Sequence, residues 1–406
     1  MFISMGKRQI GVRSYFMKKV IHNLSTSKNG MFYILLFMLT NILFLACGQE
    51  KNWDDVLDLM VDLPEEGRQI AAERWLERQN AFPLVEDSTV VFIYRNRRDI
   101  PVFLTGDFNG WSDKAEPFLK IIGTDIYYRR HSFRPDARVE YKIIAGKKWL
   151  LDSLNHNVAS GGFGSNSVLF MPEYRFPREI LRLRNKAYTK LDTVSFKAGG
   201  GEYRGYVYRH PEAAEQDPFI VFNDGGDYIR FGQATVIMDN LIREGRLPAL
   251  NALFVDPLDR MRELRFDDDY LKRLLREIVP ACLKQYALRP SHIYMGGASL
   301  GGLTSLYALR DHGTMLEGLF SQSGSFWVDS LRIVKALDKA AIKGKKIYVS
   351  YGLYESQDEN QKKTVNFLKE QQARLKVQAV ADGHNWGNWS GTLGSALRFL
   401  LSSGEK

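Results

Sequence analysis

The segment GASLG (297–301) constrains the fold of this chain more than any other. It follows an apolar run of strand length, IYMGG (293–297), and precedes a run of helical composition, GLTSLYALR (302–310). In a G-x-S-x-G turn between a strand and a helix, the serine lies on a strained backbone, and small neighbours are needed because strand and helix approach closely. We therefore interpret Ser299 as a nucleophile presented at the end of a strand rather than as an ordinary turn serine.

The second half of the chain alternates apolar runs of strand length with longer helical stretches. An amphipathic helix is predicted over about 266–286. Strands are predicted at 218–224, 249–256, 293–297 and 345–352. Apolar runs joined by helices of a dozen or more residues are typical of a mostly parallel sheet with helices on both faces. Residues 190–402 are therefore predicted to form a domain of the α/β class.

A serine hydroxyl needs a base to take its proton, and in this fold the order along the chain is Ser, acid, His. Downstream of Ser299 the sequence contains only His312 and His384. His312 follows the helix after the turn too closely, and we expect it to cap that helix or to face solvent. His384 lies in the loop DGHNW (382–386), ahead of a final helix. We predict that His384 is the general base.

The third catalytic member should orient the imidazole and stabilise its cation. It is expected just after the strand KKIYVSYG (345–352), at the edge of the sheet where that strand ends. Glu355 is our first choice, Asp358 the second and Asp382 the third.

Negative charge on the tetrahedral oxygen requires backbone N–H donors. One is expected from Leu300, the residue after the nucleophile. The other is expected from the loop NDGG (223–226), with Gly226 as the donor; the alternative is that Gly225-Gly226 forms a simple tight turn.

The first half of the chain has a different texture. Residues 53–82 show helical periodicity interrupted by Pro64, which predicts two short helices. Between 84 and 175 short strands alternate with Gly, Asp and Pro turns. Such spacing favours a small antiparallel β-sandwich.

The N-terminal extension explains most of the formal net charge of +9. Residues 1–46 contain six basic and no acidic residues, and without them 50 basic residues face 47 acidic ones. No dense basic stripe remains, so nucleic-acid binding is not expected. The apolar run 31–46 after lysines predicts an export signal, and its end at Ala46-Cys47 resembles a bacterial lipoprotein signal with Cys47 acylated. The alternative is a retained membrane anchor helix.

Cys282 is the other cysteine of the chain and lies in an apolar helical stretch, where a buried, unreactive thiol is the expected outcome. No C-x-x-C or H-E-x-x-H spacing is present. We expect neither a metal nor an organic cofactor.

Five motifs follow one another in the second half of the chain. They are RMREL (260–264), GGASLGGL (296–303), SQSGSFW (321–327), YGLYE (351–355) and GHNWGNW (383–389). Together they resemble the enterochelin (enterobactin) esterases, within the wider family that includes esterase D and feruloyl esterases. The loop NDGGDY departs from the family pattern. Upstream, GDFNGW (106–111) resembles the early-set, immunoglobulin-like module that precedes the catalytic domain in that group.

The resemblance implies an α/β-hydrolase fold after this module and a serine carboxylesterase. The export signal, rather than the resemblance, predicts that this enzyme lies in the periplasm or at the outer membrane. It implies a substrate that is a ferric siderophore ester, such as a catecholate trilactone. Arg260, Glu263 and Trp386 are the candidate substrate-binding residues, although Arg260 could instead pair with an acid. Trp327 and Trp389 are weaker candidates, and Trp111 is expected in the sandwich core.

Two alternatives remain open. The first is an esterase that removes feruloyl or acetyl groups from plant polysaccharide. The second is a non-catalytic protein that binds glycan or another ligand.

Overall fold

The structure is a computed structural model that describes residues 52–402 apart from 115, 185, 338–341 and 357. The predicted export signal (1–46) and Cys47 lie outside the described residues. Within this described part of the chain, no helix has both the length and the apolar composition needed to cross a membrane.

The described chain forms two compact units. The first contains the residues up to Leu104 together with 113–133 and 142–156. The second contains 105–112, 134–141 and the chain from Asn157 onward. The second unit therefore includes two upstream segments besides the predicted α/β domain.

Helices and a sheet make the core of the first unit. Helices α3 (Trp53–Asp62) and α4 (Glu65–Leu76) are separated at Pro64, as the periodicity indicates. Apolar side chains of both helices are buried against a four-stranded antiparallel sheet of order β1-β2-β6-β5. Its strands are β1 (Leu84–Glu86), β2 (Thr89–Arg95), β5 (Leu119–Lys120) and β6 (Ile126–Ser132).

Another antiparallel sheet is built from residues between 102 and 170. Its order is β4-β3-β7-β10-β9, and β8 pairs with β7. Its strands are β3 (Val102–Gly106), β4 (Glu116–Pro117), β7 (Arg138–Ala145), β8 (Lys148–Leu150), β9 (Val158–Gly161) and β10 (Gly164–Phe170). The region from 84 to 170 thus consists of short strands, while its assignment as an early-set sandwich stays a prediction.

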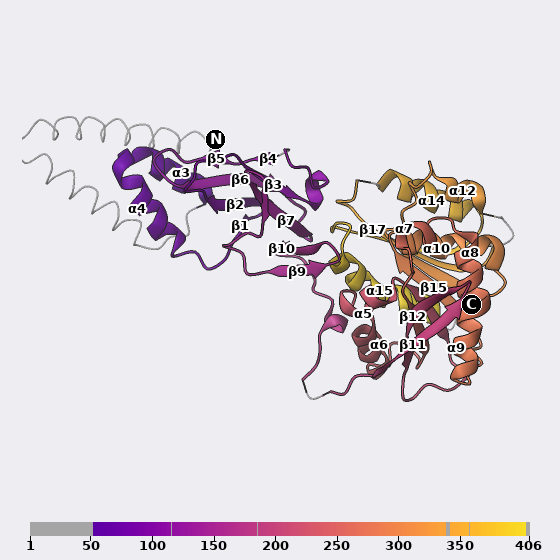
Figure 1. The fold of residues 1–406 in the computed structure, drawn as a ribbon. Helices are drawn as coiled ribbons and strands as arrows, with labels where there is room; N and C mark the ends of the chain where they lie inside the picture. The colour runs from indigo at the N-terminus through magenta and orange to yellow at the C-terminus, as the bar shows by residue number, and fades with distance from the viewer. Residues whose placement is uncertain (1–51, 115, 185, 338–341, 357, 403–406) are drawn as a thin grey trace, which may run out of the picture. The chain divides into compact units, whose positions relative to one another are not determined.

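The second unit contains an eight-stranded sheet of order β11-β12-β14-β13-β15-β16-β17-β18 (Figure 1). The pairs β11–β12 and β12–β14 are antiparallel, and all pairs from β14 to β18 are parallel. The strands are β11 (Leu191–Ala198), β12 (Gly201–Arg209), β13 (Phe219–Asn223), β14 (Asn251–Val255), β15 (Ile293–Ala298), β16 (Gly318–Gln322), β17 (Lys346–Gly352) and β18 (Arg374–Val380).

Helices cover both faces of this sheet. Along β13, Phe219 and Val221 join one apolar cluster and Ile220 and Phe222 join the other, because successive side chains of a strand point to opposite faces. The first cluster is covered by α8 (Asp268–Lys272), the π-helical stretch η3 (Arg273–Ile278), α9 (Val279–Gln285), α10 (Leu300–Tyr307), α11 (Leu309–His312), α12 (Arg332–Ala336) and α14 (Asp358–Glu370). The second is covered by α5 (Gly225–Arg230), α6 (Ala234–Arg243) and α15 (Trp386–Leu401).

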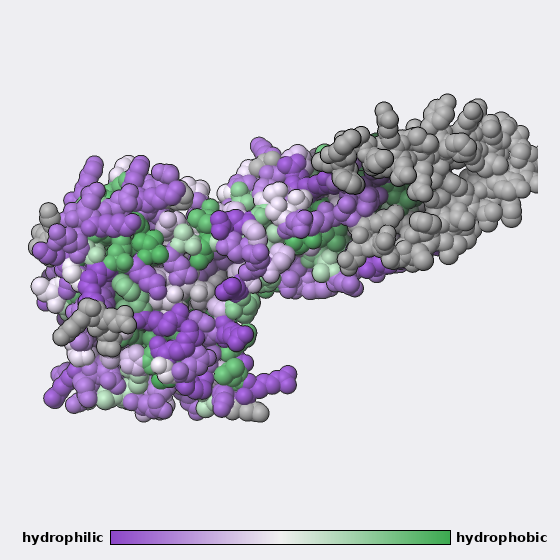
Figure 2. Space-filling view, turned by 180° about the vertical axis from the view of Figure 1, so that it is seen from behind, coloured by the Kyte–Doolittle hydropathy of each residue, from purple (hydrophilic) through white to green (hydrophobic). Residues whose placement is uncertain are grey.

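This mostly parallel sheet is of the predicted α/β class. Because parallel strands end at the same edge of a sheet, the loops after β13, β15, β16, β17 and β18 gather at one edge. The face of the molecule in Figure 2 is largely hydrophilic, with apolar residues in separate patches.

Candidate active site

Ser299 occupies the sharp turn between β15 and α10. Its φ is +56° and its ψ is −121°, a combination that is strained for a residue with a side chain. A Cβ atom on Gly297 would lie 2.5 Å from the carbonyl carbon of Gly301, so no larger residue fits there. The first glycine of the motif is therefore required by the close approach of strand and helix.

Ser299, His384 and Glu355 form one chain of hydrogen bonds. The Oγ of Ser299 lies 3.0 Å from Nε2 of His384. Nδ1 of His384 lies 3.0 Å from Oε2 of Glu355, whose side chain is only 3% exposed. With Nδ1–H donated to the carboxylate, Nε2 is left to accept the serine proton. The three predicted catalytic residues are thus brought together in the order that the sequence indicates.

The second oxygen of Glu355 is held by its surroundings. Oε1 accepts hydrogen bonds from the Gly352 amide at 2.7 Å and from the Ser323 hydroxyl at 2.5 Å. The side-chain nitrogen Nδ2 of Asn388 lies 3.4 Å from the same oxygen. These hydrogen bonds fix the orientation of the carboxylate toward the imidazole.

The other candidates for base and acid have different surroundings. His312 is buried at the end of α11 instead of facing solvent, and it takes no part in the described hydrogen bonds of Ser299. Asp382 accepts hydrogen bonds from the Gly383 amide at 2.7 Å and the Asn385 side chain at 2.9 Å. It therefore shapes the loop of His384 and does not contact the imidazole. Asp358 is the first residue of α14.

A buried ionic network binds the loop that carries His384 (382–386), and all members of the network belong to the second unit. Arg138 contacts Glu140 at 2.7 Å, Asn385 at 2.8 Å and Asp382 at 3.1 Å. Burial raises the pKa of Asp382 to about 6, although Arg138 opposes the shift. Burial alone would lower the pKa of Arg138, but the Asp382 and Glu140 carboxylates raise it above its usual value.

Asp107, from the segment GDFNGW, completes this network. Its Oδ2 accepts hydrogen bonds from the Glu140 amide at 2.8 Å and from Nδ2 of Asn385 at 3.1 Å. Burial, followed by the nearby carboxylates, raises the pKa of Asp107 well above its usual value. A side chain at Gly383 would collide with the Asp107 carboxylate, so the glycine before His384 is required by this contact.

A cavity of about 260 Å³ opens over Ser299. Its lining residues are Asp107, Gly110, Trp111, Ser299, Ser325, Trp327, Tyr354, Glu355, Ser356 and His384. Trp327 is 48% exposed, and Trp111 is half-buried. Nε1 of Trp111 donates to Oδ1 of Asp107 at 3.1 Å. Trp111 therefore lines the cavity, and its expected place in the sandwich core is not what the structure shows.

The two predicted oxyanion donors have different surroundings. Leu300 is the first residue of α10, and the first N–H groups of a helix have no partner within it. The Gly226 amide instead donates to Oδ1 of Asp256 at 2.6 Å. The carboxylate just after β14 thus occupies the N–H group of Gly226 in this structure, and its role as an oxyanion donor stays a prediction.

The charged side chains of Arg260 and Glu263 in RMREL (260–264) mainly bind other residues of the protein. Arg260 binds Asp224 through two hydrogen bonds, of 2.9 and 2.8 Å, so its guanidinium is engaged by the protein itself. Burial raises the pKa of Asp224, while Arg260 opposes the shift. Glu263 is 1% exposed and accepts hydrogen bonds from the Tyr203 hydroxyl at 2.6 Å and the Leu258 amide at 2.7 Å. The carboxylate of Glu263 is thus enclosed by the protein, and its substrate-binding role stays a prediction.

Trp386 packs among aromatic side chains. Its ring is edge-on to Tyr228 at 5.1 Å and to Trp389 at 4.8 Å between centroids. Trp386 and Trp389 are not among the residues that line the cavity over Ser299. Trp111 and Trp327 line this cavity instead, and a role of Trp386 in substrate binding stays a prediction.

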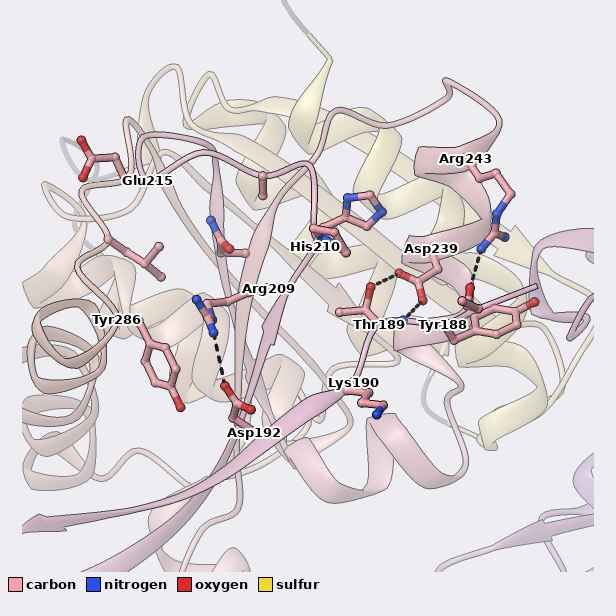
Figure 3. A pocket seen from close by; sticks show the side chains of 15 residues that line it. Tyr188, Thr189, Lys190, Asp192, Arg209, His210, Glu215, Asp239, Arg243 and Tyr286 are labelled. Carbon is pink, nitrogen blue, oxygen red and sulfur yellow. Dashed lines mark hydrogen bonds and ion pairs between the residues drawn. The ribbon is translucent and has the colours of Figure 1, made fainter. Parts of the chain in front are cut away.

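A larger cavity of about 700 Å³ lies elsewhere on the second unit (Figure 3). Two of its charged groups bind other groups of the chain: Asp239 accepts from the Thr189 hydroxyl at 2.7 Å, and Arg209 lies 3.6 Å from Asp192. No serine or cysteine lines this cavity, so it offers no nucleophile of either kind for acyl transfer.

No cluster of three His, Cys, Asp or Glu side chains suited to a metal ion was found where the chain is described. Cys282 is buried, and burial raises the pKa of its thiol to about 12. It is therefore a protonated thiol at neutral pH.

Sequence reasoning missed Ser323, Ser325, Asp107 and Arg138. The two serines belong to the motif SQSGSFW, which carries the family resemblance but does not by itself reveal their contacts. Asp107 and Arg138 precede the α/β sheet in sequence, and no local signal places them beside His384.

Residues 197–400 match the family described as "Putative esterase". The chain belongs to this family. The match begins in β11 and ends in α15, so it includes Ser299, Glu355 and His384.

Curated relatives of this esterase family member include two iron(III) enterobactin esterases. The chain is 25% identical to that of Dickeya dadantii (strain 3937) over 213 residues, or 47% of this chain and 49% of the relative. It is 27% identical to that of Escherichia coli (strain K12) over 119 residues, or 28% of this chain and 30% of the relative. The chain therefore spans at most about half the length of these relatives.

Solved structures of similar fold include two further esterases. The ferric enterobactin esterase from Salmonella typhimurium has a TM-score of 0.68 and 20% identity, over 81% of this chain and 98% of that one. The enterobactin esterase from Shigella flexneri, crystallised in the presence of enterobactin, has a TM-score of 0.67 and 19% identity, over 81% of this chain and 97% of that one. These likenesses confirm a fold of the α/β-hydrolase type.

Proposed function

We propose that this protein is a serine carboxylesterase that works through an acyl-enzyme. The observation that carries the proposal is the hydrogen-bond chain from Ser299 through His384 to Glu355, with separations of 3.0 Å at both steps. Such a chain joins a nucleophile, a base and a group that orients the base.

In the proposed reaction, the Oγ of Ser299 attacks the ester carbonyl carbon while its proton moves to Nε2 of His384. The Glu355 carboxylate stabilises the resulting imidazolium. The Leu300 N–H donates to the oxyanion of the tetrahedral intermediate. His384 then protonates the leaving alkoxide, and a water molecule releases the acyl group by the same steps in reverse order.

The preferred substrate in this proposal is a ferric siderophore ester such as a catecholate trilactone. The names of the curated relatives support this choice, since both are iron(III) enterobactin esterases. The cavity supports an aromatic ester because Trp111, Trp327 and Tyr354 line it. A feruloyl ester of plant polysaccharide also carries an aromatic ring and is the second candidate on the same observation.

A hydrolysis panel tests this proposal with the full chain. The panel contains a catecholate trilactone, with and without iron, a feruloyl ester and an acetylated xylan. We expect the fastest turnover on the trilactone and a loss of about 10⁴-fold or more for Ser299→Ala. Faster turnover of the feruloyl ester would favour the second candidate. A wild type without activity, and whose Ser299 does not react with a fluorophosphonate, would instead be a binding protein.

We also propose that residues 1–46 are a lipoprotein export signal and that acylated Cys47 anchors the protein outside the cytoplasm. Metabolic labelling with a fatty-acid analogue tests this, and Cys47→Ala should abolish the label. Residues 84–175 are proposed to form the early-set module that precedes the catalytic domain.

A further inference from the structure

We propose that Ser325 is a second catalytic serine, whose hydroxyl donates a hydrogen bond to the nucleophilic oxygen of Ser299. The two Oγ atoms are 3.2 Å apart, and Ser325 is 3% exposed and lines the cavity over the nucleophile. This inference rests on the proposed esterase function. It adds a group that acts on the attacking atom itself rather than on the imidazole or the oxyanion.

The direction of this hydrogen bond follows from the protons available. Nδ1–H of His384 is donated to Glu355, so Nε2 of the neutral imidazole can only accept. The single proton of the Ser299 hydroxyl is therefore donated to His384, at 3.0 Å. Oγ of Ser299 can then only accept from Ser325. Within the described chain, the Ser325 hydroxyl has no other side-chain or backbone partner.

The backbone around Ser325 holds its hydroxyl in place. The Ser325 amide donates to the Ser299 carbonyl at 3.0 Å, and the Val328 amide donates to the Ser325 carbonyl at 3.2 Å. Just upstream, Nε2 of Gln361 donates to the Gly324 carbonyl at 2.5 Å. All three contacts use backbone atoms of the loop, so they survive when the Ser325 hydroxyl is removed.

The same loop also supports the other end of the triad. Ser323 donates to Glu355 at 2.5 Å and accepts from Nε1 of Trp389 at 2.9 Å. Two serines, two positions apart, thus contact the acid and the nucleophile. One short backbone segment joins the two serines. The Ser323 amide donates a hydrogen bond of 2.6 Å to the Ser350 carbonyl and so holds this segment to β17.

Donation from Ser325 acts most strongly when Ser299 carries negative charge. During attack, the new bond joins Ser299 Oγ to the carbonyl carbon, its O–H bond breaks and the proton goes to His384. The Ser325 proton stays on Ser325 and stabilises the charge that builds on the attacking oxygen, because hydrogen bonds to charged acceptors are stronger than those to neutral ones. In the acyl-enzyme the same oxygen is an ester oxygen and a poor acceptor. When water displaces it, charge returns and Ser325 donates again.

The test compares Ser325→Ala with the wild type and with Ser195→Ala, a change at an exposed strand residue outside the site. The measurements are kcat/KM for p-nitrophenyl acetate across pH and the second-order rate of fluorophosphonate labelling. We expect Ser325→Ala to lose about 10-fold to 100-fold in both rates, less than the loss of a full oxyanion donor. The midpoint of the pH profile should stay unchanged, since this midpoint reports the free enzyme's base.

Each outcome has a separate meaning. If the wild type reacts with the fluorophosphonate and Ser325→Ala shows the same two rates, the role of Ser325 is overturned. The proposed esterase function then stays intact. A rate loss accompanied by a shifted pH midpoint would also overturn it, because Ser325 would then act through His384. An unreactive wild type would overturn both proposals. If Ser325→Ala does not fold, Ser325→Cys takes its place, and a rate equal to that of the wild type contradicts the inference because a thiol is a weak donor.

Discussion

Asn385, the residue directly after His384, donates a hydrogen bond to Asp107 across 278 positions of the chain, at 3.1 Å. The same side chain accepts from Arg138 at 2.8 Å through its Oδ1. The position of His384 therefore depends on two segments that precede the α/β sheet in sequence. Four predictions concern these contacts and the site that they support.

Removal of Arg138 should destabilise the fold strongly. Arg138→Met leaves buried Asp382 and Glu140 without their cation, and loss of one partner of a buried ion pair costs about 3–5 kcal/mol. The free energy of unfolding, measured with urea, should fall by this amount. Arg134→Met is the matched control, since its pair with Asp136 is exposed and worth about 1 kcal/mol or less. Equal effects of the two substitutions would contradict a structural role for the network.

The buried Asp382 carboxyl should make stability depend on pH. Its pKa is about 6 in the folded protein and about 3.9 when unfolded, so the folded state holds an extra proton between these values. The contribution of this group to the free energy of unfolding therefore falls as pH rises from about 4 to about 6. As pH falls from 7 to 4.5, the wild type should gain on the order of 2 kcal/mol relative to Asp382→Asn.

Urea unfolding of the wild type and Asp382→Asn at a series of pH values measures this difference. Glu212→Gln, at an exposed position, serves as the control and should show a constant difference from the wild type. A difference between wild type and Asp382→Asn that does not change with pH would show that the carboxyl titrates normally.

His384 and Glu355 should contribute unequally to ester hydrolysis. His384→Ala removes the base, and kcat should fall by roughly 10⁴-fold to 10⁶-fold. Glu355→Gln keeps the shape of the side chain but loses the charge that stabilises the imidazolium, so a loss of about 10³-fold to 10⁴-fold is expected. Steady-state kinetics with p-nitrophenyl acetate measures both, and His210→Ala, in the cavity of Figure 3, should match the wild type. A Glu355→Gln variant of normal kcat would remove Glu355 from the triad.

Trp111 should select esters with aromatic acyl groups. Trp111→Ala removes one wall of the cavity, so KM for an aromatic ester should rise about 10-fold while KM for an acetyl ester changes little. Trp111→Phe keeps a ring but loses the hydrogen bond to Asp107. If both variants lose activity equally on the two esters, Trp111 acts by holding Asp107 and not by contact with substrate. Trp149→Ala, at an exposed tryptophan of the first unit, is the control.

The triad could be predicted because its signals are local. The GASLG turn follows an apolar strand, Glu355 follows the predicted strand that forms β17, and His384 lies in a loop ahead of a final helix. The strands β13, β14, β15 and β17 were predicted for a similar reason, since buried parallel strands are continuous apolar runs. The edge strand β18 escaped prediction because most of its side chains are at least partly exposed, and it contains Arg374 and Lys376.

Contacts between distant segments could not be predicted. The motif RMREL does not show that Arg260 pairs with Asp224, which lies 36 positions earlier. The NDGG loop does not show that Asp256 accepts the hydrogen bond of Gly226. In each case a charged group of the protein binds the polar group for which the sequence predicted a role with the substrate or the oxyanion. Only the three-dimensional arrangement separates these possibilities.

The dependence of the histidine loop on upstream segments also bears on how the chain folds. During synthesis, Asp107 and Arg138 are made long before their partners, and Arg138 precedes Asp382 by 244 positions. Contacts of such large sequence separation form late, because a long loop must be closed before they stabilise the chain. The catalytic centre is therefore expected to be among the last regions to become ordered. An incomplete or newly made chain would then have a folded sheet, while His384 would not yet be positioned beside Ser299.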